Sequence, residues 1–241
     1  PGEVRHEGHP NMLNEALAPG LLPPGQRLYA IGDVHGCAHR LAALHVAIRE
    51  DVGRRPIPRV TVLYLGDYVD RGLDSALVLE TLLGPPPVPG AEVVLLKGNH
   101  EAMMIDACSL GATSSSLRFW MENGGLATLE SYDTDPGTPN WLERIPPGHL
   151  ALLRRCVLRH AAGDYLFVHA GVRPEVPLDR QDPHDLLWIR EPFLSWKGAL
   201  GAVVVHGHTP TAKPEVRPHR IGIDTGACFG GVLTCLVLEG E

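Results

Sequence analysis

The sequence predicts an α/β fold built around a largely parallel β-sheet. Three observations support it: short apolar runs rich in β-branched residues, helical patterns between the early runs, and polar clusters where most runs end. Such runs, bounded by turn-forming residues, are typical of buried strands. Strands that alternate with helices favour parallel pairing. The six predicted strands are Arg27–Ile31, Val60–Leu65, Glu92–Leu96, Asp164–Val168, Gly201–Val205 and Gly231–Leu238.

Two helices are predicted between the first three strands. The first is Ala38–Arg49, because its apolar residues recur at the spacing of one helix face. That face consists of Leu41, Leu44 and Ile48. The second helix is Ser75–Leu83, and the prolines of Pro85–Pro89 mark a loop before the third strand.

The chain divides into an N-terminal segment and one main domain. Residues 1–26 contain several Pro and Gly residues with little periodicity, so we expect an arm or linker there. Residues 27–241 are long enough for a single domain with a large core. Within this domain, residues 102–162 show mostly helical patterns with Pro-rich breaks, and we expect a helical insert before strands resume at Asp164.

Composition excludes several classes of protein. The formal net charge of −7 and the low aromatic content of 5% argue against nucleic acid as a partner. No apolar run approaches the roughly 20 residues that span a bilayer, so we expect no membrane partner. Five widely spaced cysteines without a C-x-x-C pair disfavour a disulfide framework or a cysteine zinc site. We therefore expect reduced thiols and a cytoplasmic location.

Polar clusters follow five of the predicted strands. In open α/β sheets ligands bind just beyond the carboxyl ends of the strands, so these clusters are expected to converge on one site. Each cluster alone is a weak signal, because Gly-Asp and Asn-His pairs are common in turns, but five in a row are not expected by chance. The clusters are Gly32–Gly36, Gly66–Gly72, Gly98–Glu101, His169–Gly171 and His206–Thr209.

The possible metal ligands in these clusters are carboxylates, imidazoles and one amide, with no thiolate. That donor set suits manganese, iron or zinc better than a soft metal. Two neighbouring cations need a shared anionic ligand, and a carboxylate such as Asp67 is suited to bridge them.

The series GDVHG, GDYVDRG, GNHE, HAG and HGHT resembles the metallophosphoesterase superfamily, specifically its phosphoprotein phosphatase branch and the bacterial and phage serine/threonine phosphatases. The resemblance extends from about Leu28 to Leu238. Trp120, Gly124-Gly125, Thr128 to Tyr132 and Ile223 to Ala227 resemble further patterns of that group. The resemblance implies a sandwich of two mixed sheets flanked by helices, with a dinuclear metal site at the carboxyl ends of the strands.

The resemblance also implies the metal ligands. Asp33 and His35 would hold the first of two divalent ions, and Asp67 would bridge both. The second ion would be completed by Asn99, His169 and His208. The ions implied are Mn²⁺, with iron or zinc as alternatives. His206 would lie outside the ligand set, because His208 matches the family position between Gly207 and Thr209.

His100, held by Asp70, would be the general acid that protonates the leaving oxygen. The alternative for Asp70 is a local turn bond to Gly72. Arg71 would bind substrate phosphate, as would Asn99.

Arg190 is a second candidate guanidinium for the phosphate group of the substrate. For Arg190 an ion pair with Glu191 is the alternative.

The implied activity is phosphomonoester hydrolysis through direct attack by metal-bound hydroxide. The substrate would be a phosphorylated protein, with serine/threonine specificity expected and dual specificity left open. A diadenosine tetraphosphatase or another hydrolase of nucleotides or small phosphoesters is the nearest alternative. A binding protein that has lost catalysis on this scaffold is a remote one, because every ligand is present.

Two other activities are disfavoured. Asp224–Ala227 resembles an aspartic protease loop, but such enzymes need two copies and this chain has one. Pro210 stands where nuclease-like relatives carry a second histidine.

Overall fold

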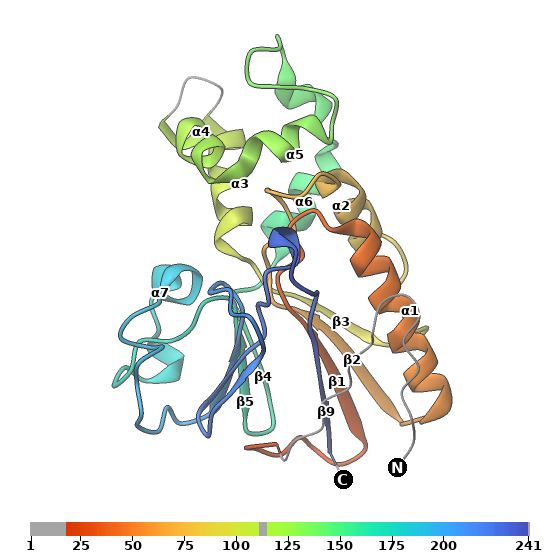
Figure 1. The fold of residues 1–241 in the computed structure, drawn as a ribbon, viewed down its shortest axis with the longest axis vertical. Coiled ribbons are helices and arrows are strands. Elements are labelled where there is room, and N and C mark those ends of the chain that lie inside the picture. Colours follow the sequence, from red (N-terminus) through yellow and green to blue (C-terminus); the bar gives the residue numbers. More distant parts are fainter. Residues whose placement is uncertain (1–17, 111–114, 241) are drawn as a thin grey trace.

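The computed structural model describes residues 18–110 and 115–240, which form two β-sheets packed face to face (Figure 1). The first sheet has the order β3-β2-β1-β9. Its strands β1, β2 and β3 are parallel and β9 is antiparallel. These strands are β1 (Gln26–Ile31), β2 (Arg59–Tyr64), β3 (Glu92–Leu95) and β9 (Cys235–Glu239).

The second sheet has the order β4-β5-β6-β8-β7. The three inner strands β5, β6 and β8 are parallel, and the two edge strands are antiparallel. The prediction of two mixed sheets is therefore confirmed. The strands are β4 (Arg159–Ala162), β5 (Tyr165–Val168), β6 (Val203–His206), β7 (Glu215–Val216) and β8 (Arg220–Gly222).

Alternating side chains give the first sheet two buried faces. In β1, Leu28 and Ala30 pack against the second sheet, and Tyr29 and Ile31 pack against helices. A third cluster covers the far face of the second sheet and includes Phe193. Because both sheets are covered on both sides, inner strands such as β5 and β6 are fully buried and consist of nearly continuous apolar runs.

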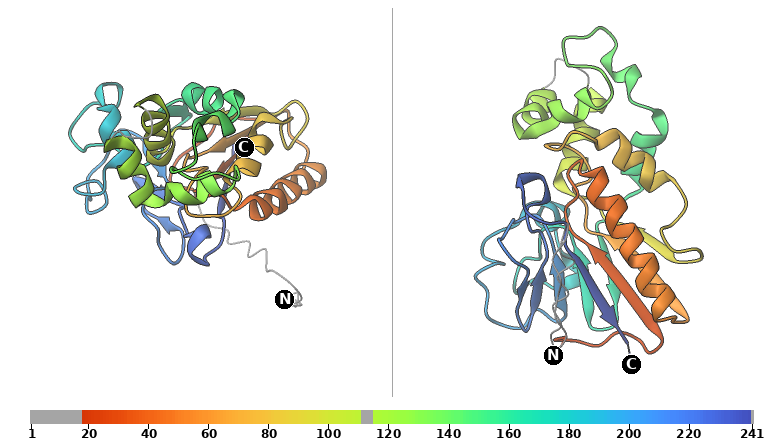
Figure 2. Two further views of the ribbon diagram at one scale, coloured as in Figure 1. Left: turned by 90° about the horizontal axis from the view of Figure 1, so that it is seen from above. Right: turned by 45° about the vertical axis from the view of Figure 1, so that its right-hand side comes forward.

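Helices cover the first sheet and the carboxyl ends of its parallel strands. In Figure 1, α1 lies along the outer face of the first sheet, and α3, α4 and α5 lie above the strand ends; Figure 2 shows the same arrangement from two other directions. The helical elements are α1 (Ala38–Arg54), α2 (Ser75–Leu83), α3 (Asn99–Leu110), α4 (Ser115–Trp120), the π-helical turn η1 (Met121–Gly125), α5 (Leu126–Glu130), η2 (Trp141–Arg144), α6 (Pro147–Arg155), η3 (Leu178–Arg180), α7 (Pro183–Trp188) and η4 (Ala227–Phe229).

Several boundaries differ from the prediction. The first helix extends to Arg54, five residues beyond its predicted end. Strand β4 (Arg159–Ala162) lies inside residues 102–162, so the helical prediction is wrong there. That strand is a half-exposed edge made of polar and small residues, and it has no apolar alternation to reveal it. Strands β7 and β8 were also missed, because two or three residues are too few to show a period.

The segment before β1 contacts the second sheet. Leu22 is buried in the core between the sheets, and the Leu21 N–H donates to Asp164 Oδ2 at 2.9 Å. Residues 1–17 of the predicted arm lie outside the described residues.

A buried arginine joins the first and last strands of the first sheet. Arg27 is 1% exposed and donates to both carboxylate oxygens of Glu239, at 2.9 and 3.0 Å. It also donates to the Arg55 carbonyl at 2.8 Å. Because the guanidinium has no access to water, these bonds supply the partners that its charge needs.

Two further expectations concern the cysteines and the membrane. All five cysteines are free, and Cys37, Cys108 and Cys156 are buried. Within the described ranges, every helix is too short or too polar to cross a lipid bilayer.

Candidate metal centre

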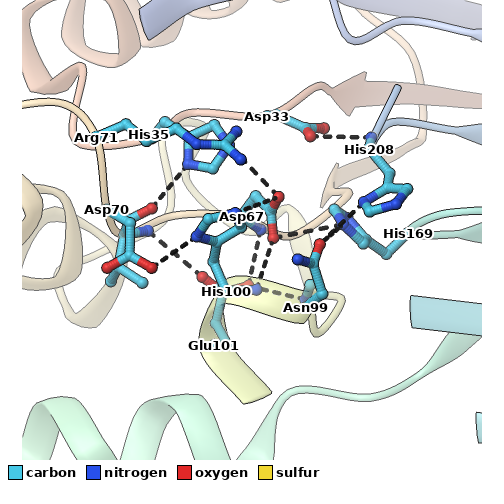
Figure 3. A network of polar contacts seen from close by, with 12 residues as sticks. Asp33, His35, Asp67, Asp70, Arg71, Asn99, His100, Glu101, His169 and His208 are labelled. Carbon is cyan, nitrogen blue, oxygen red and sulfur yellow. Dashed lines mark hydrogen bonds and ion pairs between the residues drawn. The ribbon is translucent and has the colours of Figure 1, made fainter. Parts of the chain in front are cut away.

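The five predicted clusters meet at one place, at the carboxyl ends of the parallel strands of both sheets. Figure 3 shows side chains from all five within one network of polar contacts. The His208 N–H, after β6, donates to Asp33 Oδ2, after β1, at 2.9 Å. His169, after β5, lies with its Nδ1 2.9 Å from the Leu65 carbonyl. Residues more than a hundred positions apart are therefore in direct contact.

Two groups of three side chains could each hold a metal ion, and they share Asp67. One is His35, Asp67 and His100, so it contains the predicted proton donor His100 and lacks the predicted ligand Asp33. The other is Asp67, His169 and His208. In each group the ligand atoms lie within 4.8 Å of one another, and every side chain is buried. A shared carboxylate between two sets of imidazoles is the arrangement that a pair of cations requires.

The backbone fixes the orientation of two of these imidazoles. His35 Nδ1 bonds the Val69 carbonyl at 2.8 Å, and His169 Nδ1 bonds the Leu65 carbonyl at 2.9 Å. A bond from Nδ1 to a carbonyl directs Nε2 into the site, which is how proteins orient histidine ligands. Asn99 Oδ1 lies 2.9 Å from His169 Nε2 and from His208 Nδ1, so the amide oxygen converges with both rings.

Buried polar atoms without a partner also indicate a cation. Asp33 Oδ1 and His208 Nε2 are buried and make no hydrogen bond. Asp33 also lies close to Gly207, where an added Cβ would come 1.9 Å from Asp33 Oδ1. Unpaired buried carboxylate oxygens are costly without a counter-charge. The residues present therefore fit the two divalent ions that the sequence implies.

The charges of the buried side chains also favour a bound cation. Burial and the neighbouring Asp224 carboxylate raise the pKa of Asp33 well above its usual range. Burial opposes ionisation of Asp67, but the imidazoles of His169 and His100 outweigh it and hold the pKa of Asp67 well below its usual range. Burial likewise opposes protonation of His169, yet the carboxylates around it, Asp67 first, raise the pKa of His169 to about 10. This cluster of buried acids attracts positive charge.

His100 and Asp70 form a buried pair beside this cluster. His100 Nδ1 lies 2.6 Å from Asp70 Oδ2, and both side chains are at most 1% exposed. The alternative bond between Asp70 and Gly72 forms only through the backbone, where the Gly72 N–H donates to the Asp70 carbonyl at 2.8 Å. The Asp70 side chain bonds His100 instead. The His100 Nε2 atom faces the centre, 3.9 Å from Asp67 Oδ2.

The two candidate arginines differ in their contacts with the site. Arg71 Nη1 is 2.8 Å from His35 Nε2, and the guanidinium lies 5.3 Å from the exposed ring of Phe229. Arg190 is exposed. Burial and the charge of His169 lower the pKa of His208, and the charge of Arg190 lowers it further. The Glu191 carboxylate bonds Ser195 instead of Arg190, so the predicted alternative ion pair is not formed.

Two residues of the site were missed by the sequence prediction. Glu101 accepts backbone N–H groups from Asp67, Tyr68 and Gly98 at 2.7–2.8 Å, and so holds the loop that presents Asp67. Its place in GNHE gave no sign of this role. Asp224 follows the short strand β8, which pairs with β6, and its charge acts on Asp33; the sequence showed Ile223 to Ala227 as a family pattern but gave Asp224 no role at the metal site.

His206 lies outside the metal groups, as the sequence predicted. Its ring packs edge-on against Phe193 with centroids 5.0 Å apart, and its Nε2 is 3.3 Å from Arg220. Burial lowers the pKa of His206 to about 4, so the ring is neutral in the core.

Backbone strain is concentrated at the site. Of the eight described non-glycine residues with positive φ, five belong to it. A left-handed backbone costs about 1–2 kcal/mol per residue, so the surrounding contacts must hold these loops in place. The five residues are His35, Asp67, Asp70, Arg71 and His208.

Known proteins resemble this chain in sequence and in fold. The family model described as Calcineurin-like phosphoesterase matches residues 26–228. The serine/threonine-protein phosphatase 1 of Salmonella typhimurium is 29% identical over 230 residues, which cover 87% of this chain and 90% of that protein. The symmetrical bis(5'-nucleosyl)-tetraphosphatase of Acidovorax sp. is 32% identical over 177 residues, 73% of this chain and 51% of that longer protein.

A solved structure adds a likeness of fold. The cold-active protein-tyrosine phosphatase of a Shewanella species superposes with a TM-score of 0.58 at 17% identity, covering 98% of this chain and 84% of that one. The family model, the relatives and the fold agree with the resemblance read from the motifs. This chain belongs to the calcineurin-like phosphoesterase family, in its phosphoprotein phosphatase branch, and is a metal-dependent phosphatase.

Proposed function

We propose that this enzyme hydrolyses phosphomonoesters on serine and threonine side chains of proteins. The observation that carries the proposal is the buried pair of His100 and Asp70, with Nδ1 and Oδ2 2.6 Å apart. Cleavage of a phosphoserine or phosphothreonine ester expels a basic alkoxide, which needs a proton. An imidazolium held by a carboxylate can supply that proton to the leaving oxygen.

The remaining side chains bind the metals and the phosphate. Asp33, His35 and Asp67 would hold one divalent ion, and Asp67 with Asn99, His169 and His208 would hold the other. When bound, such ions activate water and neutralise charge on the phosphoryl oxygens. The oxygen and nitrogen ligands suit Mn²⁺, with iron and zinc as alternatives.

Arg71 and Arg190 bind the phosphoryl oxygens of the substrate. A guanidinium can pair two oxygens at once, which orients the ester as well as holding it. Asn99 contributes its amide N–H₂ to the same group. Arg71 supports this role because its guanidinium already lies at the metal groups, 2.8 Å from His35 Nε2.

A diadenosine tetraphosphatase is the second candidate, favoured by the 32% identity to the symmetrical enzyme. Two arguments place it second. The leaving group in that reaction is a phosphate chain, far less basic than an alkoxide, so it has less need of a proton donor. The relative at 29% identity, whose match covers 87% of this chain and 90% of that protein, is named a serine/threonine phosphatase.

Parallel assays on Mn²⁺-loaded enzyme test the proposal. One follows phosphate release from a phosphothreonine peptide, and the other follows cleavage of diadenosine tetraphosphate. A higher kcat/KM for the peptide supports the protein phosphatase. A higher kcat/KM for the dinucleotide assigns the chain to the second function, and two bound metals with no turnover of either substrate indicate the inactive scaffold.

Metal identity and location are part of the proposal. Metal analysis of enzyme purified without added metal, followed by reactivation of the apoenzyme with each ion, tests Mn²⁺ against iron and zinc. The cytoplasmic location rests on the cysteine pattern, and fractionation of the source cells tests it.

A further inference from the structure

Three residues of the helical segment above the site contact the loop after β2. Trp120, Gly124 and Thr128 recur every four positions through α4, η1 and α5. They belong to the motifs noted in the sequence, and the proposed reaction assigns no role to them. We call these three residues the clamp.

Trp120 contacts the carboxylate that orients His100. Its indole Nε1–H donates to Asp70 Oδ1 at 2.8 Å and to Oδ2 at 3.0 Å. The indole is fully buried and lies next to Trp141, with ring centroids 6.5 Å apart. A buried donor shared between the two oxygens fixes the plane of the carboxylate.

Thr128 contacts the same residue from another direction. Its hydroxyl oxygen accepts the Asp70 N–H at 2.8 Å, and its O–H donates to Asp70 Oδ1 at 2.7 Å. It is also 3.1 Å from Ser75 Oγ, at the start of α2. One side chain therefore holds both the backbone and the carboxylate of Asp70.

Gly124 completes the clamp at the next residue of the loop. Its carbonyl accepts the Arg71 N–H at 3.2 Å. Gly124 itself has φ +103, and an added Cβ would lie 2.9 Å from Arg71 Cγ. Only glycine allows this approach, since a side chain would be strained and would collide with Arg71.

We infer that Trp120 and Thr128 are positioning residues for the proton donor, acting on His100 through Asp70. The inference rests on the proposed function. The clamp holds Asp70 and Arg71 in the left-handed backbone that they would otherwise leave, with φ +73 and +69. Three donor contacts from Trp120 and Thr128 on the two carboxylate oxygens then hold Asp70 Oδ2 in place as the acceptor for His100 Nδ1.

Leaving-group dependence separates positioning from a structural role. Phenyl phosphate and p-nitrophenyl phosphate have the same shape at the phosphate, but the nitrophenolate leaves without assistance. A misplaced proton donor slows the first ester more than the second, whereas a disturbed metal site or fold slows both.

Trp120→Phe removes the indole donor and keeps an aromatic ring. We expect kcat on phenyl phosphate to fall about 10-fold, because a hydrogen bond to a charged group is lost, with KM unchanged. On p-nitrophenyl phosphate we expect a change of less than about twofold. Trp141→Phe is the matched control, since it trims the neighbouring ring without touching Asp70, and it should leave the ratio of the two rates at the wild-type value.

Thr128 provides a second variant that does not depend on the tryptophan. Thr128→Val keeps the shape and loses the hydroxyl, and it should repeat the selective loss; Thr128→Ser restores the hydroxyl and should restore the ratio. Equal losses on both esters, or a wild-type ratio in Trp120→Phe and Thr128→Val, overturn the positioning role and leave the proposed function standing. Wild-type enzyme inactive on both esters overturns the proposed function and this inference with it.

Discussion

Replacing Asp70 by asparagine should abolish most of the proton donation by His100 while leaving the metal site intact. The side chain is almost isosteric, but the carboxylate accepts donors at both oxygens: His100 and Trp120 at Oδ2, Trp120 and Thr128 at Oδ1. Whichever way the amide is oriented, its NH₂ group faces a donor. If the NH₂ group faces His100, the imidazole must accept that bond at Nδ1 and therefore carry its own proton on Nε2.

The magnitude follows from the lost charge. With Nδ1 and Oδ2 2.6 Å apart, the centres of the imidazolium and carboxylate charges lie about 4 Å apart. At an effective dielectric constant of about 20, that attraction is about 4 kcal/mol. One decade in rate corresponds to about 1.4 kcal/mol, so kcat on an alkyl phosphoester should fall about 10³-fold. This lies within the span of about 10²–10⁴ typical of general acids.

The assay is steady-state hydrolysis of a phosphothreonine peptide, with bound metal measured on the same samples. Asp74→Asn is the matched control: it makes the same change four residues later, at an exposed position whose side chain caps nothing. Wild-type kcat in Asp70→Asn with full metal content would refute the role of the pair. A parallel loss of metal would mean that Asp70 supports the centre rather than the acid.

Three further predictions address the metal centre and the fold. Asp67→Asn should remove bound metal, because one neutral amide cannot bridge two cations, and elemental analysis should show less than half of the wild-type content. Gly207→Ala should weaken metal binding about 10- to 100-fold, since the added Cβ would lie 1.9 Å from Asp33 Oδ1 and displace that oxygen. Metal titration of the apoenzyme measures the affinity, and an unchanged affinity would contradict the prediction. Glu239→Gln should destabilise the fold by about 1–2 kcal/mol in urea unfolding, discounted for the partial exposure of Glu239, because buried Arg27 loses the nearer of its two carboxylate partners and keeps only Asp51 at 3.5 Å. The bond from Arg27 lowers the pKa of Glu239 in the folded protein. The stabilisation from this bond is therefore present above the pKa of Glu239 in the unfolded chain and is lost as the pH falls through its pKa in the folded protein. Wild type and variant should converge in stability at acid pH.

The sequence alone was sufficient for the class of fold and for the convergence of the five polar clusters. Turn residues at strand ends such as Gly66-Asp67 and Gly98-Asn99 are local signals, and a parallel sheet brings its carboxyl ends to one edge, so convergence of the ligands could be predicted. The motif also placed His206 outside the ligand set because His208 matches the family position, and His206 packs against Phe193.

Tertiary structure decided what the local pattern does not encode. Strand β4 was hidden because an edge strand with half-exposed small residues needs no apolar alternation. Asp224 enters the site only because the three-residue strand β8 pairs with β6. The contact from Trp120 to Asp70 joins residues fifty positions apart, and its geometry depends on how a helical segment packs over a strained loop. Periodicity and turn chemistry are properties of neighbours in sequence, whereas these three features depend on which surfaces the folded chain brings together.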